Sequence, residues 1–116
     1  MTDNTRKIGA FWEKQVAEYL EMEGMEILDM NYRTRYSEID IIARDKEEIV
    51  FIEVKYRTSS FSGNPLEAVD SKKQNRIRNA ALYYLSDHNY IEDRTSIRFD
   101  VIGIEGQNIE HIKMAF

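Results

Sequence analysis

The stretch EIDIIARDKEEIVFIEVKYR, residues 38–57, contains two runs rich in isoleucine and valine that are separated by a short polar segment. Runs of this kind, bounded by turn-forming residues, are typical of β-strands. We expect one strand at 38–44 and another at 48–56. A two-residue turn at Lys46-Glu47 then joins them into an antiparallel hairpin.

The turn also determines which side chains meet across this hairpin. If Asp45 lies opposite Glu48, moving five residues away from the turn along each strand brings Asp40 opposite Glu53. Directly opposed side chains of an antiparallel pair lie on one face, about 5 Å apart. Lys55 shares the face of Glu53 because side chains alternate along a strand. A register shift of one residue would separate the two carboxylates.

Two facing carboxylates repel each other, and a divalent cation removes that repulsion. Mg²⁺ is commonly held by one or two carboxylates together with water and substrate phosphate, and a bound metal ion acidifies water. Asp40, Glu53 and a lysine, Lys55, that orients or deprotonates water therefore suit metal-assisted phosphodiester hydrolysis. The alternative is an ordinary solvent-facing strand, but Ile49 and Phe51 share this face, which an idle solvated surface would not require.

Helical periodicity predicts two helices. Apolar residues recur at three- and four-residue spacing over 8–20, and Gly24 is well placed to end that helix. The same spacing occurs over 71–86, where Ser71 and Gln74 form a capping box.

The remaining apolar runs predict three further strands, at 25–32, 95–105 and 109–114. Because a helix separates strand 48–56 from strand 95–105, these two strands are expected to run parallel. The chain length allows one domain, residues 1–116, and not two. We expect an α/β fold with a mixed sheet flanked by helices.

The composition excludes several classes of protein. The chain has no cysteine, which rules out disulfides, thiolate nucleophiles and cysteine-based zinc sites. No apolar run approaches the roughly 18 residues of a membrane span, and the N-terminal residues are polar rather than signal-like. A cytoplasmic protein is the expectation.

The charge distribution bears on nucleic-acid binding. With 21 acidic and 16 basic residues the net charge is −5, unlike the strongly basic footprint of a simple DNA-backbone binder. A local basic run nevertheless occurs at Lys72, Lys73, Arg76 and Arg78, with no acid among residues 71–86. Such a run either meets phosphates or is a solvated helix face.

Glu13 borders the apolar stripe of the first helix, where a carboxylate needs a partner such as a metal ion, a basic side chain or backbone donors. It belongs to a set of short motifs spread over nearly the whole chain. The motifs include Gly9-x-x-x-Glu13, Asn31-Tyr32-Arg33, Glu38-Ile39-Asp40-Ile41-Ile42-Ala43, Val50-Phe51-Ile52-Glu53-Val54-Lys55-x-Arg57, and Arg98-Phe99-Asp100-Val101. Together they resemble the YraN-like family of small bacterial proteins, from which the chain departs in having Ser37 where the family usually has glycine.

That family is similar to the PD-(D/E)XK nucleases, and among them to archaeal Holliday-junction resolvases. The resemblance implies a restriction-endonuclease-like α-β-β-β-α-β core and a nuclease site that uses Mg²⁺ or Mn²⁺. By motif, Asp40 corresponds to the first metal-binding acid, Glu53 and Lys55 to the E-x-K pair, and Glu13 to the helix acid. The implied metal ligands are Glu13, Asp40 and Glu53, and the implied catalytic residues are Asp40, Glu53 and Lys55.

The expected partner is nucleic acid, DNA with branched or junction features in the first place, and a homodimer would suit the two strands of a junction. The residues expected to contact nucleic acid are Arg57, Lys72, Lys73, Gln74, Arg76 and Arg78. An alternative is a non-catalytic module of the same fold that binds nucleic acid or a repair protein, which the overall acidity favours. A third interpretation is a metal-binding protein without a nucleic-acid role.

Other chemistry-bearing side chains have simpler interpretations. Asp100 beside Arg98 favours a structural ion pair, and His111 is expected on the surface of its strand. Of the adjacent rings at Tyr83 and Tyr84, helical geometry buries one and exposes the other, so that only Tyr83 is available to stack on a base.

Overall fold

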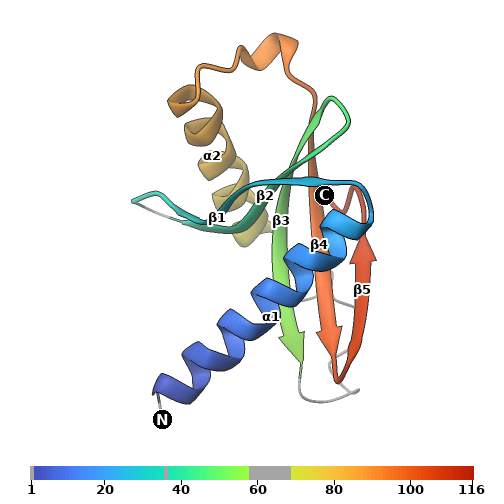
Figure 1. The fold of residues 1–116 in the computed structure, drawn as a ribbon. Helices are drawn as coiled ribbons and strands as arrows, with labels where there is room; N and C mark the ends of the chain where they lie inside the picture. The colour runs from blue at the N-terminus through green and yellow to red at the C-terminus, as the bar shows by residue number, and fades with distance from the viewer. Residues whose placement is uncertain (1, 36, 58–68) are drawn as a thin grey trace.

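The computed structural model describes residues 2–35, 37–57 and 69–116, with side chains described for 9–35, 37–56 and 69–116. Its elements follow the expected order, the strand expected at 109–114 included, with one short 3-10 helix in addition (Figure 1). They are α1 (Thr2–Met22), β1 (Glu26–Arg33), β2 (Glu38–Asp45), β3 (Glu48–Arg57), α2 (Ser71–Asp87), the short 3-10 helix η3 (Glu92–Arg94), β4 (Ile97–Glu105) and β5 (Asn108–Ile112). The predicted α-β-β-β-α-β core is therefore confirmed.

The five strands form one mixed sheet in the order β1-β2-β3-β4-β5. The pairs β1–β2, β2–β3 and β4–β5 are antiparallel, whereas β3 and β4 are parallel, as the intervening α2 requires. Asp45 pairs with Glu48 around a turn in which Lys46 has a φ of 60°. The predicted register of the β2–β3 hairpin is thus correct.

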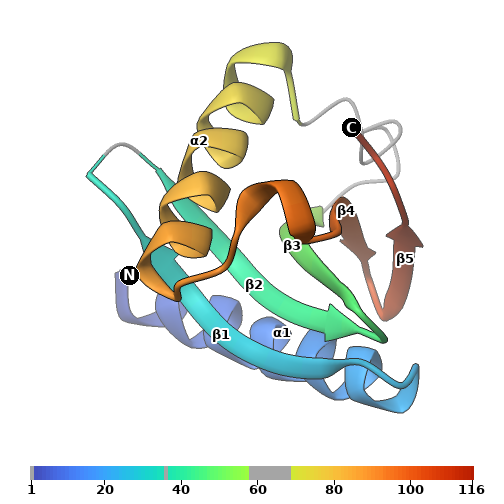
Figure 2. The same cartoon turned by 90° about the horizontal axis from the view of Figure 1, so that it is seen from above.

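The two helices cover opposite faces of the sheet (Figure 2). On the α1 face, Val16 and Leu20 pack with the buried residues Ile41, Val50 and Ile52. The alternation along each strand turns the neighbouring side chains to the other face.

On the α2 face, Ile42 and Phe51 pack with Ile77, Tyr84 and Leu85 of the helix. All five side chains are at most 3% exposed. Asp40 lies two residues before Ile42 on β2, and Glu53 lies two residues after Phe51 on β3. At these two positions the same face carries acids instead of apolar side chains. The core therefore ends where the candidate site begins.

The helix ends are fixed locally. Gly24 takes a φ of 94° after α1, a left-handed conformation that glycine adopts without strain. At the start of α2 the predicted capping box is wrong, because Asp70 is the N-cap and its carboxylate accepts a hydrogen bond from the Lys73 amide at 2.8 Å. The Gln74 side chain instead donates to the Val69 carbonyl at 3.0 Å.

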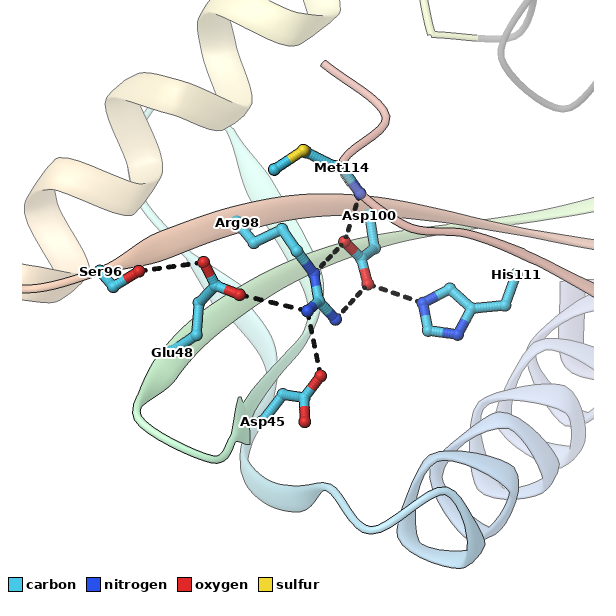
Figure 3. A network of polar contacts seen from close by, with 7 residues as sticks. All are labelled: Asp45, Glu48, Ser96, Arg98, Asp100, His111 and Met114. Atoms are coloured by element: carbon cyan, nitrogen blue, oxygen red, sulfur yellow. Dashed lines mark hydrogen bonds and ion pairs between the residues drawn. The ribbon is translucent and has the colours of Figure 1, made fainter.

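A buried polar network joins β4 to β5 (Figure 3). Asp100 is fully buried, and both of its oxygens accept from Arg98, at 2.8 and 2.9 Å. It also lies 2.6 Å from His111 Nε2 and accepts from the Met114 amide at 3.1 Å. Burial alone would raise the pKa of Asp100, but these hydrogen bonds outweigh it and lower the pKa below its usual value. Asp100 is structural, as predicted.

The same network corrects one expectation and ties in the hairpin turn. The His111 side chain is 4% exposed and not on the surface, because the buried carboxylate of Asp100 holds it inward. Arg98 Nη1 extends to Asp45 at 3.0 Å and to Glu48 at 3.2 Å, the two residues that flank the β2–β3 turn. One arginine thus anchors the hairpin on which the candidate site is built.

Candidate active site

Asp40 and Glu53 lie in contact on the α2 face of the sheet. The register from Ile41–Ile52 continues by one step to place them opposite each other, and their side chains are hydrogen-bonded. Asp40 Oδ2 also accepts from the Val54 amide at 2.8 Å, which fixes the carboxyl group over β3. Glu53 is 5% exposed. The convergence expected from the sequence is therefore present.

Close contact between the buried acid Glu53 and the partly buried acid Asp40 disfavours ionisation of both. Burial, followed by the charge of Glu53, raises the pKa of Asp40 to about 7, although the hydrogen bond from Val54 opposes the shift. Near neutral pH the pair consequently retains a proton. A divalent cation between the carboxylates would take the place of that proton.

Two lysines approach the same oxygen of Glu53. Lys55 Nζ lies 3.4 Å from Glu53 Oε1, and Lys73 Nζ, from the first turn of α2, lies 2.8 Å from it. Both ammonium groups are partly buried, at 27% and 36% side-chain exposure. The cluster therefore combines two acids with two bases where β2, β3 and α2 meet.

The two lysines differ in how firmly they hold a proton. Burial, together with the hydrogen bond to Lys73, lowers the pKa of Lys55 below its usual value. Burial also disfavours the charge of Lys73, but its hydrogen bonds to Glu53 and Lys55 outweigh this and raise its pKa. Lys73 is thus the stable cation, and Lys55 is the group better suited to accept a proton from water.

The structure does not place Glu13 with this cluster. α1 packs on the opposite face of the sheet, and Glu13 Oε2 accepts from the Asn31 side chain at 3.0 Å. Across 2–35, 37–57 and 69–116, no three His, Cys, Asp or Glu side chains are grouped so as to hold a metal ion. A metal ion at Asp40 and Glu53 would complete its coordination with water and phosphate, as Mg²⁺ usually does.

The basic residues of α2 do not form one surface. Lys73 faces Glu53, whereas Lys72 and Arg76 are exposed. The Arg78 guanidinium lies over the rings of Phe99 and Phe116, at 5.0 and 5.3 Å from their centres. Arg78 is therefore held on another side of the helix than Lys73. The side chain of Arg57 lies outside the described residues.

Sequence reasoning assigned Lys73 to phosphate contact and missed its ion pair with Glu53. One signal was available in the helical periodicity. Lys73 precedes the buried Ile77 by four residues, so it lies on the edge of the helix face that packs against the sheet. Which strand residue it reaches depends on how α2 is placed on the sheet.

A family model described as "Uncharacterised protein family UPF0102" matches residues 12–104. The chain is 46% identical to a UPF0102 protein of Alkaliphilus oremlandii over 115 residues, covering 96% of this chain and 98% of that protein. It is 48% identical to a UPF0102 protein of Syntrophus aciditrophicus over 120 residues, covering 100% and 92% respectively. Both matches extend over the strands and the helix that carry Asp40, Glu53, Lys55 and Lys73. The chain belongs to the uncharacterised protein family UPF0102, which is the YraN-like family.

Proposed function

We propose that this protein is a metal-dependent nuclease that hydrolyses phosphodiester bonds of DNA at the Asp40–Glu53–Lys55 cluster. The observation that carries the proposal is the contact between the buried carboxyl group of Glu53 and the partly buried one of Asp40, with lysines beside them. The acids fit a hard divalent cation, Mg²⁺ or Mn²⁺, because all their donor atoms are oxygens and the pair carries excess negative charge once ionised.

Each residue of the cluster then has a distinct task. Asp40 and Glu53 would hold the cation, which supplies charge stabilisation at the phosphoryl group and acidifies bound water. Lys55, in the neutral form that its lowered pKa favours, would accept a proton from the attacking water as the new oxygen–phosphorus bond forms, and the ester oxygen that leaves would take a proton from solvent. Lys73 keeps its positive charge and is placed to pair with a phosphate oxygen once Glu53 has another partner.

A cleavage screen with a matched control tests this proposal. Labelled duplex, flap, single-stranded and four-way DNA would each be incubated with the protein and with Mg²⁺ or Mn²⁺. We expect cleavage of at least one substrate by the wild type and loss of cleavage in Glu53→Gln. Glu110→Gln, which changes an exposed acid on β5, should cleave as the wild type does. Unchanged cleavage by Glu53→Gln, or none by the wild type with either metal, would refute the proposal.

The second candidate is a non-catalytic nucleic-acid-binding module of the same fold. One observation favours it: within the described parts of the chain, no third His, Cys, Asp or Glu side chain is grouped with Asp40 and Glu53 so as to hold a metal ion. Such a module would bind DNA equally well in EDTA and in Mg²⁺, and Glu53→Gln would leave its binding intact. The cleavage screen therefore separates the two functions.

A further inference from the structure

A groove lies between α2 and Thr34, which follows β1. It has a volume of about 550 Å³, within the range of ligand pockets. It is lined by Thr34, Arg76, Asn79, Leu82, Tyr83 and Ser86. A second hollow of about 350 Å³ adjoins it and shares Thr34 and Tyr83 with it. We call the two together the α2 groove.

The α2 groove begins beside the candidate active site. Arg76 follows Lys73 by one helical turn, and Tyr83 follows Arg76 by two, so all three lie along one side of the helix. At 1.5 Å per residue, Lys73 and Tyr83 are about 15 Å apart along the helix axis. On the other wall, Thr34 precedes β2, the strand that carries Asp40. Arg76 therefore lines the part of the α2 groove that is nearest along the helix to Lys73.

The lining combines exposed apolar surface with cations. The Tyr83 ring is 52% exposed and Leu82 is 43% exposed, values that a purely structural helix face does not need. Arg76 is exposed beside them, and Arg33 in the adjoining hollow has a side chain that is 78% exposed. Arg33 pairs with Glu38 at 3.3 Å, but an exposed pair of this kind is weak and leaves the cation accessible.

The only acid lining either hollow, among the described residues, is Asp87 at the end of α2. Its carboxylate accepts a short hydrogen bond from the Tyr32 hydroxyl, at 2.6 Å. In a protein whose net charge is −5, this groove is a local surface in which arginines outnumber acids. It fits an anionic partner with flat apolar groups.

Unpaired nucleotides have that chemistry. Aromatic rings that stack on bases, next to basic groups that follow the phosphates, are the typical surface for single-stranded nucleic acid. A duplex fits less well, because its bases are stacked on one another and present no face to a tyrosine. The amide group of Asn79 and the hydroxyl group of Ser86 can supply hydrogen bonds to base edges.

We propose that the α2 groove binds a single-stranded segment of the nucleic acid, with a base stacked on Tyr83 and a phosphate paired with Arg76. The inference rests on the proposed function in one respect: the bound segment is part of a substrate only if the nearby cluster cleaves nucleic acid. It narrows the substrate class to nucleic acid that carries unpaired nucleotides next to the cleaved bond.

Binding is tested in EDTA, so that cleavage does not contribute. Fluorescein-labelled twelve-nucleotide oligothymidylate and a twelve-base-pair blunt duplex would be titrated with the full chain and followed by fluorescence anisotropy. We expect tighter binding of the oligothymidylate, with Tyr83→Ala weakening it by about fivefold or more, as loss of one stacked base implies. Tyr83→Phe keeps the ring and should bind as the wild type does.

Two controls make the result specific. Phe11→Ala removes a ring of similar exposure, 54%, from α1 and should leave binding unchanged. Because binding is measured in EDTA, where no metal-dependent cleavage occurs, the wild type should bind oligothymidylate whether or not it cleaves DNA in the cleavage screen, so that failure of the proposed function and failure of the groove are distinguishable. The inference is overturned if the wild type does not bind oligothymidylate, if duplex binds equally well, or if Tyr83→Ala binds like the wild type.

Discussion

Replacing Asp40 by asparagine should stabilise the metal-free protein at alkaline pH. The substitution removes a charge from a buried position beside Glu53, and it keeps an oxygen that accepts the hydrogen bond from the Val54 amide. The volume of the side chain hardly changes. The expected change in the free energy of unfolding is therefore electrostatic and depends on pH.

The magnitude follows from the pKa of Asp40, which rises from 3.8 to about 7 on folding. A pKa raised in the folded state means that the folded protein binds the proton more tightly than the unfolded chain does. Stability is accordingly greatest below the unfolded value, near pH 4, and is lost as the pH rises through about 7. Three pKa units correspond to at most about 4 kcal/mol at pH 8.

Urea unfolding in EDTA, followed by fluorescence of the single tryptophan Trp12, measures this difference. We expect Asp40→Asn to exceed the wild type by about 2–4 kcal/mol at pH 8 and to match it near pH 4. Asp93→Asn, at an exposed position in η3, serves as the control and should show no gain.

Excess Mg²⁺ should raise the free energy of unfolding of the wild type more than that of Asp40→Asn. The wild type gains stability because the cation binds the folded state, whereas Asp40→Asn lacks one of the two carboxylates and gains little. A variant that is less stable than the wild type at pH 8 in EDTA would refute the electrostatic reasoning, as would an equal gain at both pH values.

Two further predictions concern single side chains. Lys73→Met removes the ammonium group that lies 2.8 Å from Glu53, so this variant should bind Mn²⁺ at least about fivefold more tightly in calorimetry. Lys72→Met, at an exposed position, should bind Mn²⁺ as the wild type does. Weaker Mn²⁺ binding by Lys73→Met would contradict this. Because the pKa of Asp100 is lowered in the folded state, this carboxylate stabilises the fold above its unfolded pKa near 4, and the stabilisation is lost as the pH falls through its folded pKa. The free energy of unfolding measured in urea should therefore fall more steeply in acid for the wild type than for Asp100→Asn. Equal acid slopes would show that the buried network does not carry this dependence.

The sequence was sufficient to predict the hairpin that carries the acids. Alternating apolar residues fixed the faces of β2 and β3, and a two-residue polar turn fixed their register, so that the contact of Asp40 with Glu53 followed from local rules alone. The parallel pairing of β3 with β4 followed in the same way from the helix between them.

The failures involve contacts between elements that are distant along the chain. The position of Lys73 against Glu53 depends on the placement of α2 on the sheet, which no local pattern encodes. His111 is polar and alternates with apolar residues along the edge strand β5, so the pattern predicted a surface position. Its inward position depends on the carboxylate of Asp100 on the neighbouring strand. Glu13 is placed by the packing of α1 against the opposite face.

The buried acid Asp100 and the partly buried acid Asp40 are satisfied to very different degrees. Asp100 has a bidentate arginine, a histidine and a backbone amide, so that its charge is fully compensated and its pKa is low. Asp40 accepts one backbone hydrogen bond and otherwise faces a second acid, and its pKa is high.

The weakly compensated carboxyl group of Asp40 destabilises the fold, and an apolar side chain in its place would extend the core formed by Ile42 and Phe51. The same chain is able to neutralise a buried acid completely, as it does at Asp100. Weak compensation at Asp40, whose neighbouring lysines pair with Glu53, is therefore a specific property of this end of the hairpin, and it is what the proposed metal site requires. The stability gain expected for Asp40→Asn measures how much of the folding free energy this arrangement costs.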